Sequence, residues 1–413
     1  MTQHELFVDD ASVFLDDDPS EESEDDLDSS SYEQTQAVVT ATDWTVETVL
    51  NQLARGNIEL NPSFQRRDAW TNRRKGRFIE SLFLGLPVPQ LVLAERQERR
   101  GSFIVIDGKQ RLLSLSQFDA GGTVSRTRGE EKPTQGFDAL KLVGLEVLDI
   151  LNNLKLGEIE DQAEYENLIT AFENQTIRTV VVRNWSDEDF LYRVFLRLNT
   201  GSLPLSPQEL RQALNPGPFI DYADEFSGDS PEIRRALRLS KPDFRMRDVE
   251  LFIRFIAFQE FLPRYDGNLK GFLDLTCQTL NEQWSSREDE LTLLSESCNH
   301  AIGTVFEIFG EDAFRRWNGS KFESRFNRAV FDAQVFFLAD AVVAGAAMDR
   351  KELVLNAFKR VSLNEQFADS VTATTKSIDA TYLRLSRWGG ELAAVLDVDI
   401  PTIELVENRI TTN

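Results

Sequence analysis

The sequence has little histidine and little cysteine. Its 413 residues contain two histidines, His4 and His300, and two cysteines, Cys277 and Cys298. A nuclease that uses histidine as base and metal ligand needs more histidine than this, so we exclude one within this chain. Two cysteines cannot build a disulfide framework or a Cys-His zinc site, which fits a reducing compartment.

Long apolar runs and a phosphate-binding P-loop are also missing. No stretch approaches the roughly 18 uninterrupted apolar residues that a membrane helix needs. The acidic N-terminus does not have the pattern of a signal peptide. We therefore expect a cytoplasmic protein without a membrane partner, in which any triphosphate chemistry uses a site other than a Walker A motif.

Negative charge dominates the chain, and its distribution is uneven. The net charge is −24, and residues 1–30 contain twelve Asp or Glu but no Lys or Arg. That segment therefore supplies half of the net charge and has few apolar residues to bury. Its composition predicts a disordered acidic tail over residues 1–40 that is dispensable for folding.

Basic residues concentrate in two segments. Residues 55–111 hold twelve Lys or Arg against six Asp or Glu, and residues 234–247 read RRALRLSKPDFRMR. One such cluster is ordinarily a solvated face, but two in so acidic a protein favour an anionic partner, either nucleotide phosphate or nucleic-acid backbone. The candidate contacts to a DNA backbone are Arg67, Arg73, Arg74, Lys75, Arg77, Arg234 and Arg235.

Hydrophobic periodicity predicts an α+β first half and an α-helical second half. In the first half we expect helices at 42–56, 71–85, from Gln110, 137–154, 186–201 and 205–214, and strands at 57–60, 87–95, 102–106 and 175–185. Ser206 and Glu209 have the spacing of a capping box. The expected organisation is a tail (1–40), a mixed-sheet domain (41–215), a helical domain (216–390) and a C-terminal segment (391–413).

The segment FIVIDGKQRLLSLSQF, residues 103–118, places charged residues between a buried strand and a buried helix. A helix N-terminus offers unpaired N–H groups, and Gly108 would let an anion approach them closely. Lys109 and Arg111 offer cationic donors, and Asp107 could hold a metal ion. The alternative is an ordinary tight turn with surface charges, since Asp-Gly is a common turn signal.

Other polar residues could join this site after folding. Gln65 and Arg66 follow a short expected strand, and Arg197 and Asn199 lie near the end of an expected helix. Spacing places Arg197 off the buried stripe of that helix.

Four segments in a fixed order resemble a known family. They are NPSFQRRDAWTNRRKGRFIESLFLGLPVPQLVLAE, FIVIDGKQRLLSLSQF, VFLRLNTGSLPLSPQELRQAL and RMRDVELFIRFIAF. Together they are similar to the N-terminal domain of GmrSD-type modification-dependent restriction enzymes, in the ParB/sulfiredoxin-like superfamily with its D-G-Q-Q-R motif. The resemblance covers roughly residues 40–345. Lys109 stands where the family has a glutamine, and RDAW lacks the usual aromatic residue before its tryptophan.

The resemblance implies a ParB-like fold followed by helices, and nucleoside-triphosphate binding and hydrolysis linked to DNA restriction. By motif it assigns Gln65, Arg66, Asp107, Gly108, Gln110, Arg111 and Asn199 to the nucleotide site. From the residues themselves we add Lys109 and Arg197 as nucleotide contacts, and expect Asp107 and Arg111 to be catalytic with Mg²⁺ on Asp107.

We therefore expect a nucleotide-dependent DNA-sensing or regulatory subunit of a phage-defence system, a possible NTPase that acts with a separate partner nuclease. Two alternatives remain: a DNA-binding module without turnover, and an inhibitor whose acidic tail mimics DNA.

Overall fold

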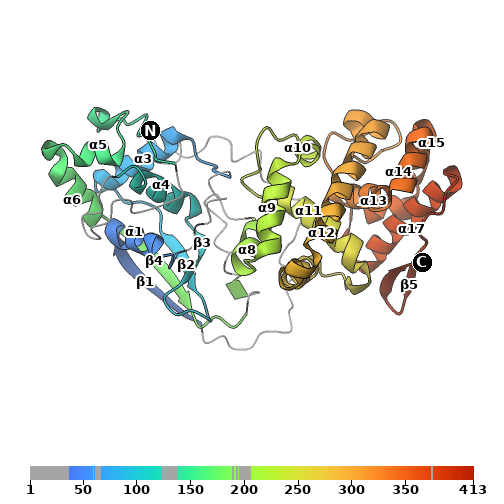
Figure 1. Cartoon of the computed structure of the whole chain (residues 1–413), viewed down its shortest axis with the longest axis horizontal. Helices are drawn as coiled ribbons and strands as arrows, with labels where there is room; N and C mark the ends of the chain where they lie inside the picture. Colours follow the sequence, from blue (N-terminus) through green and yellow to red (C-terminus); the bar gives the residue numbers. More distant parts are fainter. Residues whose placement is uncertain are drawn as a thin grey trace. The chain divides into compact units, whose positions relative to one another are not determined.

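The computed structural model describes residues 37–58, 60, 67–122, 138–187, 190–191, 194, 206–373 and 375–413. The chain divides into two compact units between Leu214 and Asn215. We call the part that ends at Leu214 the N-terminal unit and the part that begins at Asn215 the helical unit (Figure 1).

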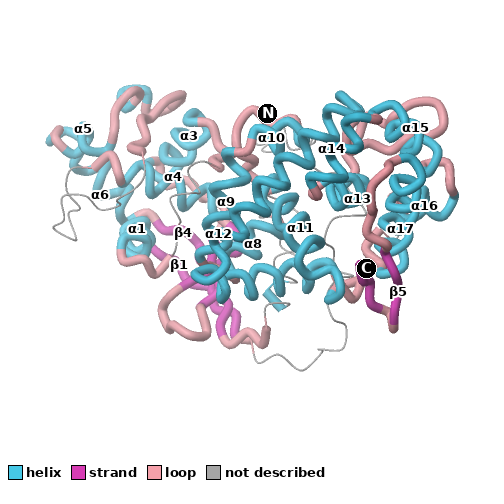
Figure 2. Tube along the Cα trace, turned by 45° about the vertical axis from the view of Figure 1, so that its right-hand side comes forward, coloured by secondary structure: helices cyan, strands magenta, loops and turns pink. Residues whose placement is uncertain are grey.

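The N-terminal unit contains a mixed sheet of four strands. They are β1 (Val38–Thr45), β2 (Leu91–Glu95), β3 (Phe103–Asp107) and β4 (Thr176–Arg183), in the order β1-β4-β2-β3. β2 and β4 run parallel, whereas β1–β4 and β2–β3 are antiparallel. The α+β class expected from the sequence is thus confirmed (Figure 2).

Helices pack around this sheet. They are α1 (Val46–Ala54), α3 (Asn72–Phe83), α4 (Lys109–Asp119), α5 (Leu156–Glu160), α6 (Glu166–Asn174) and α8 (Pro207–Leu214). Leu91, Leu93 and Val181 from the strands share one core with α1, α3, α4 and α6. Stacked and edge-to-face contacts join Phe83, Phe118 and Phe172 within it, so this core fixes where α4 begins relative to β3.

The start of the described chain differs from expectation. Residues 38–45 form edge strand β1, so the predicted tail is too long at its C-terminal end and the predicted helix 42–56 begins too early. The run VVTATDWT is rich in β-branched residues and pairs with β4 along its whole length. α1 begins at Val46, where the Thr45 hydroxyl caps the N–H of Thr48. The expected strand 57–60 is reduced to one bridge between Ile58 and Phe103 among its described residues.

The helix predicted over residues 137–154 is wrong. Residues 138–148 are irregular, and only the 3₁₀ helix η3 (Asp149–Leu151) forms in the described part of this stretch. The carboxylate of Glu80 accepts the N–H groups of Glu146, Val147 and Leu148, which replaces helical hydrogen bonding. The prediction failed because tertiary contacts to α3 outweigh the local apolar pattern.

Nine helices and a hairpin make up the described residues of the helical unit. They are α9 (Pro218–Asp229), α10 (Pro231–Leu237), α11 (Arg247–Phe261), α12 (Leu269–Phe309), α13 (Arg328–Leu338), α14 (Ala341–Asp349), α15 (Lys351–Val361), α16 (Glu365–Ser370), α17 (Ile378–Val395), β5 (Ile403–Val406) and β6 (Arg409–Thr412). Short 3₁₀ helices complete the description: η4 (Ala163–Tyr165), η5 (Leu262–Arg264) and η6 (Gly310–Asp312).

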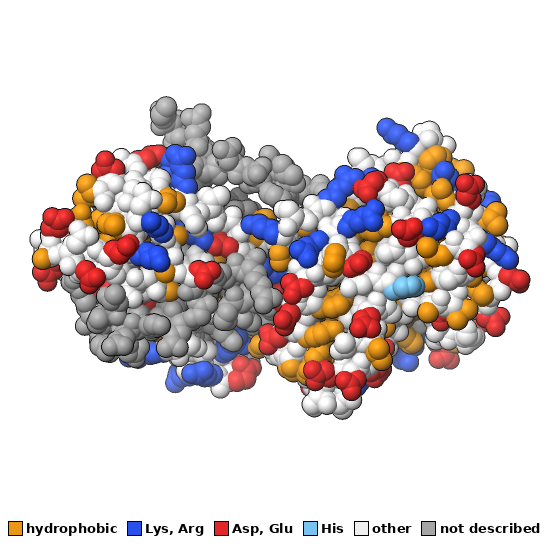
Figure 3. Space-filling model, turned by 45° about the horizontal axis from the view of Figure 1, so that its top comes forward, with side chains coloured by type: hydrophobic (Ala, Val, Ile, Leu, Met, Phe, Trp, Pro, Cys, Tyr) orange, Lys and Arg blue, Asp and Glu red, His pale blue; other side chains and the backbone are white. Residues whose placement is uncertain are grey.

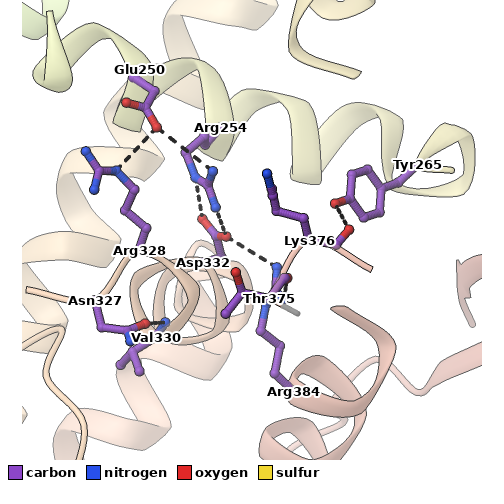
Figure 4. A network of polar contacts seen from close by, with 10 residues as sticks. All are labelled: Glu250, Arg254, Tyr265, Asn327, Arg328, Val330, Asp332, Thr375, Lys376 and Arg384. Carbon is purple, nitrogen blue, oxygen red and sulfur yellow. Dashed lines mark hydrogen bonds and ion pairs between the residues drawn. The ribbon is translucent and has the colours of Figure 1, made fainter. Parts of the chain in front are cut away.

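A buried charge network ties α11, α13 and α17 together (Figure 4). The guanidinium of Arg254 bonds Asp332 through two nitrogens, one of them at 3.2 Å, and both side chains are 2% exposed. Arg384 donates to the same carboxylate at 3.5 Å and to the Thr375 carbonyl at 2.6 Å. Arg328 pairs with Glu250 at 3.3 Å beside them. Such pairing offsets the cost of burying each charge.

No single helix in the described residues is long and apolar enough to cross a membrane. One consecutive pair, α13 and α14, has enough apolar length together, but the two are bent by 101°.

Candidate anion-binding site at the strand-helix junction

The junction between β3 and α4 is built around Gly108. This residue has a φ of 105°, and a Cβ placed on it would lie 2.4 Å from Cδ2 of Leu91 and 3.3 Å from Nη2 of Arg111. Only glycine fits such a position without displacing its neighbours. The sequence predicts an anion close to Gly108. In the structure, the guanidinium of Arg111 occupies the space beside Gly108.

Arg111 turns back toward the end of β3. Its Nη2 donates to Oδ2 of Asp107 and to the carbonyl of Gln90, both at 2.8 Å. The residue is 6% exposed, and its buried Nε has no hydrogen-bond partner among the described residues. Arg111 is thus fixed in place while one donor remains unused.

Lys109 points to another helix. Its ammonium donates to Oε1 of Glu209 on α8 at 2.7 Å, and both side chains are buried. The second oxygen of Glu209 accepts the N–H of Ser206, and the Ser206 hydroxyl accepts the N–H of Glu209. The capping box expected from the sequence is therefore present, and it also holds Lys109.

Gln110 anchors the segment before α3. Its Oε1 accepts the N–H groups of Ala69 at 3.3 Å and Trp70 at 3.4 Å. A second link comes from Lys75 on α3, which bonds Asp68 and also donates to Gln117 on α4 at 2.7 Å. The start of α3 is consequently held against α4 at two places, through Gln110 in the first turn of α4 and through Gln117 near its end.

Arg74 lies in the first turn of α3, at this same place. Its guanidinium stands over the Trp70 ring, 4.7 Å from the ring centre, and the side chain is half-buried. Burial, together with the positive charge of Arg111, lowers the pKa of Arg74 from its ordinary value. Among the described residues, no acid cancels the positive charge of Arg74 at this site.

Other predicted residues fall in different places. Gln65, Arg66, Arg197 and Asn199 lie outside the described residues. Arg67 and Lys75 are 1% and 3% exposed, so neither reaches a DNA backbone from the surface, and these two expectations are corrected. Both are buried because the segment they flank is folded against α4.

The remaining basic candidates stay accessible. Arg73 is exposed, and Arg77 is half-buried and paired with Glu146. On α10, Arg234 bonds the carbonyls of Asp229 and Ser230, whereas exposed Arg235 pairs with Glu311 at 3.2 Å. Basic and acidic side chains are interspersed on the visible face of the helical unit (Figure 3).

Arg315 is a cation that sequence reasoning missed. Burial and the charge of Arg238, just after α10, lower the pKa of Arg315. The two residues are far apart in sequence, so no local pattern links Arg315 to the 234–247 cluster. They enlarge the basic surface next to α10.

Asp107 is the residue expected to bind a metal ion at the junction. The described residues contain no cluster of three or more His, Cys, Asp or Glu that could hold one. Mg²⁺ commonly binds one or two carboxylates together with substrate phosphates, so a single Asp107 is chemically compatible with it. One of its oxygens is already occupied by Arg111.

The fold, the junction and the order of the motifs can now be compared with known proteins. A family model described as the GmrSD restriction endonuclease, N-terminal domain, matches residues 46–215. Residues 46–215 form a GmrSD N-terminal domain. A search of curated proteins gave no match to the chain.

The GmrSD N-terminal domain contains β2, β3, β4, α4 and α8, and so the whole junction. The family resemblance stated from the motifs is confirmed. The presence of this domain indicates a component of a restriction-like defence system.

Proposed function

We propose that the protein is a nucleotide-dependent sensor or regulatory subunit of a restriction-like phage-defence system, acting in the cytoplasm with a separate nuclease. The observation that carries this proposal is the buried guanidinium of Arg111, fixed at the β3–α4 junction of the GmrSD N-terminal domain, whose Nε has no hydrogen-bond partner in the described part of the chain. A buried, preorganised cation at a helix N-terminus suits a phosphoryl group that gains charge during transfer.

The described residues would take separate parts in triphosphate hydrolysis. Arg111 would neutralise charge as water attacks the terminal phosphorus and the bond to the diphosphate oxygen breaks, releasing inorganic phosphate. Asp107 would hold Mg²⁺ against the phosphate oxygens. Lys109 and Gln110 would hold the start of α4 in place. The side chain of Lys109 bonds Glu209, and that of Gln110 bonds the backbone of residues 69 and 70.

Phosphate release from each of the four nucleoside triphosphates, with and without duplex DNA, tests this proposal. We expect release with at least one of them and a loss of about a hundredfold in Arg111→Lys and Asp107→Asn. Arg100→Gln, in the exposed β2–β3 turn, is the matched control and should retain the wild-type rate. No release by the wild type with any triphosphate, in either condition, would refute the hydrolytic role.

DNA binding without turnover is a second candidate, favoured by the basic surface at α10. Exposed Arg235 and Arg238, with Arg315 beside Arg238, would contact phosphates irrespective of sequence. The variant Arg235→Gln/Arg238→Gln should bind duplex DNA more weakly, and the slope of log affinity against log salt should fall by about one per lost contact. An unchanged slope would remove this surface as a DNA site.

A further inference from the structure

Arg74 differs from the other inward-facing arginines of this protein. Arg254 is also buried, which by itself lowers its pKa. The charge of Asp332 outweighs this effect and raises the pKa of Arg254 above its ordinary value. Arg74 has no carboxylate partner among the described residues, and the first turns of both α3 and α4 lack acidic residues. A half-buried cation without a counter-ion is costly unless a ligand supplies one.

The position of Arg74 brings it to the same place as Arg111. Gln110 precedes Arg111 on α4 and accepts N–H groups from residues 69 and 70, just before α3. Lys75 follows Arg74 and bonds Gln117 on α4 at 2.7 Å. Lys75 thus contacts the last turn of α4, whereas Trp70, whose N–H bonds Gln110, lies at its first turn and has the Arg74 guanidinium 4.7 Å from its ring centre. Arg74 is close enough to Arg111 for the charge of Arg111 to lower the pKa of Arg74.

We propose that Arg74 and Arg111 form a guanidinium pair that binds one phosphate group of the nucleoside triphosphate between them. This inference rests on the proposed function and assigns Arg74, until now a candidate for the DNA backbone, to the nucleotide site. Asp107 partly neutralises the charge of Arg111. The pair therefore keeps a net positive charge, that of Arg74, which the bound phosphate would neutralise. Two guanidinium groups offer paired donors in the geometry that phosphate oxygens accept.

A polyphosphate fits this pair better than a duplex does. Arg111 is 6% exposed and Arg74 is half-buried, whereas contacts to a DNA backbone come from side chains that extend from the surface. A small polyphosphate can approach partly buried guanidinium groups more closely than a continuous duplex can. Inorganic tripolyphosphate is therefore the probe of choice, with duplex DNA as the competing arm.

Arg74→Met is the informative variant. Methionine keeps an unbranched apolar stem against Trp70 but removes the charge. Since the mutual repulsion with Arg111 also disappears, we expect the unliganded variant to unfold at the same temperature as the wild type or higher. Its affinity for tripolyphosphate, measured by calorimetry, should fall by at least about tenfold, as for loss of a charge-assisted hydrogen bond.

Three companion measurements complete the test. Arg74→Lys should recover part of the affinity, because it restores the charge without the paired donors. Arg100→Gln should bind tripolyphosphate as the wild type does. Duplex DNA affinity should be the same in Arg74→Met and the wild type, and its selective loss would instead make Arg74 a DNA contact and overturn the proposal.

The remaining outcomes separate this inference from the function on which it rests. Wild-type tripolyphosphate affinity in Arg74→Met, with a lowered unfolding temperature, would show that Arg74 only packs on Trp70; the nucleotide proposal would survive. If the wild type binds neither tripolyphosphate nor any nucleoside triphosphate, both proposals fail together.

Discussion

The ammonium of Lys109 and the carboxylate of Glu209 lie 2.7 Å apart in the interior of the N-terminal unit, with 6% and 7% of their side chains exposed. The pair joins the first residue of α4 to α8, a hundred positions later in the sequence. Lys109 is therefore a structural partner of a helix cap.

Glu209→Gln should destabilise the protein by about 3 kcal/mol, because a glutamine keeps the cap but removes the carboxylate charge that faces the buried ammonium of Lys109. Urea unfolding measures this loss. The matched control is Glu158→Gln, which alters an exposed capping-box residue on α5 without breaking a buried ion pair, and should stay within about 0.5 kcal/mol. Equal effects of the two substitutions would show that the ion pair does not contribute to stability. Adding Lys109→Met to Glu209→Gln should recover part of the lost free energy of unfolding.

Gly108→Ala should destabilise the N-terminal unit by about 2–4 kcal/mol, since strain at positive φ adds to a clash with Leu91. Gly56→Ala is the control, because Gly56 also has a positive φ, 65°, but a Cβ there meets nothing within 4 Å. It should cost only about 1 kcal/mol. Thermal unfolding of both variants gives the comparison, and indistinguishable losses would mean that the contact with Leu91 relaxes freely.

Asp332→Asn should cost about 3–5 kcal/mol, because Arg254 and Arg384 then share no carboxylate in the core of the helical unit. Glu391→Gln breaks an ion pair with exposed Arg360 instead and should change the free energy of unfolding by at most about 1 kcal/mol. Urea titration of both variants tests the difference. A loss below 1 kcal/mol for Asp332→Asn would mean that water or another group takes the place of the carboxylate.

Tyr265 should make stability fall in alkali. Burial raises the pKa of Tyr265 from 10.0 to about 12, against the opposing charges of Arg384 and Arg254, so the native state keeps the phenol proton longer than the unfolded state. The resulting contribution of Tyr265 to the free energy of unfolding is fully present below pH 10. This free energy falls by roughly 3 kcal/mol in all as the pH rises to about 12.

Urea unfolding between pH 9 and about 12 measures that loss. Tyr265→Phe should be less stable than the wild type at pH 9, because the bond to the Lys376 carbonyl is gone, but its stability should fall less steeply with pH. Tyr382→Phe removes a phenol from a half-buried position on the same helix as Arg384 and should leave the slope as in the wild type. Parallel curves for the wild type and Tyr265→Phe would contradict the assignment.

Local signals were sufficient for much of the fold. Thr71 and Phe83 bound α3 close to the predicted helix 71–85, and the Ser206–Glu209 capping box marks the start of α8. These features depend on residues within one or two turns of each other, so their spacing is visible in the sequence. β1 was missed because its strand character depends on pairing with β4, more than 130 residues away.

The same distinction between local and long-range contacts applies to the site. The motif located the junction, but the direction of each side chain came from distant partners: Arg111 bonds Gln90, Lys109 bonds Glu209, and Gln110 bonds the backbone at 69–70. Which member of a charged motif faces a ligand is decided by these long-range contacts. Arg74 shows the converse, since it was assigned to a surface cluster by composition and lies beside Arg111 in space.

α8 is held at both ends by the N-terminal unit. Glu209 in its first turn holds Lys109, and the carbonyl of Ala213 near its end accepts a bond from Arg96 at 3.2 Å. Its last residue, Leu214, is also the point from which the helical unit continues. Eight residues of helix span about 12 Å, so these two contacts together fix both the position and the direction of α8 within the N-terminal unit.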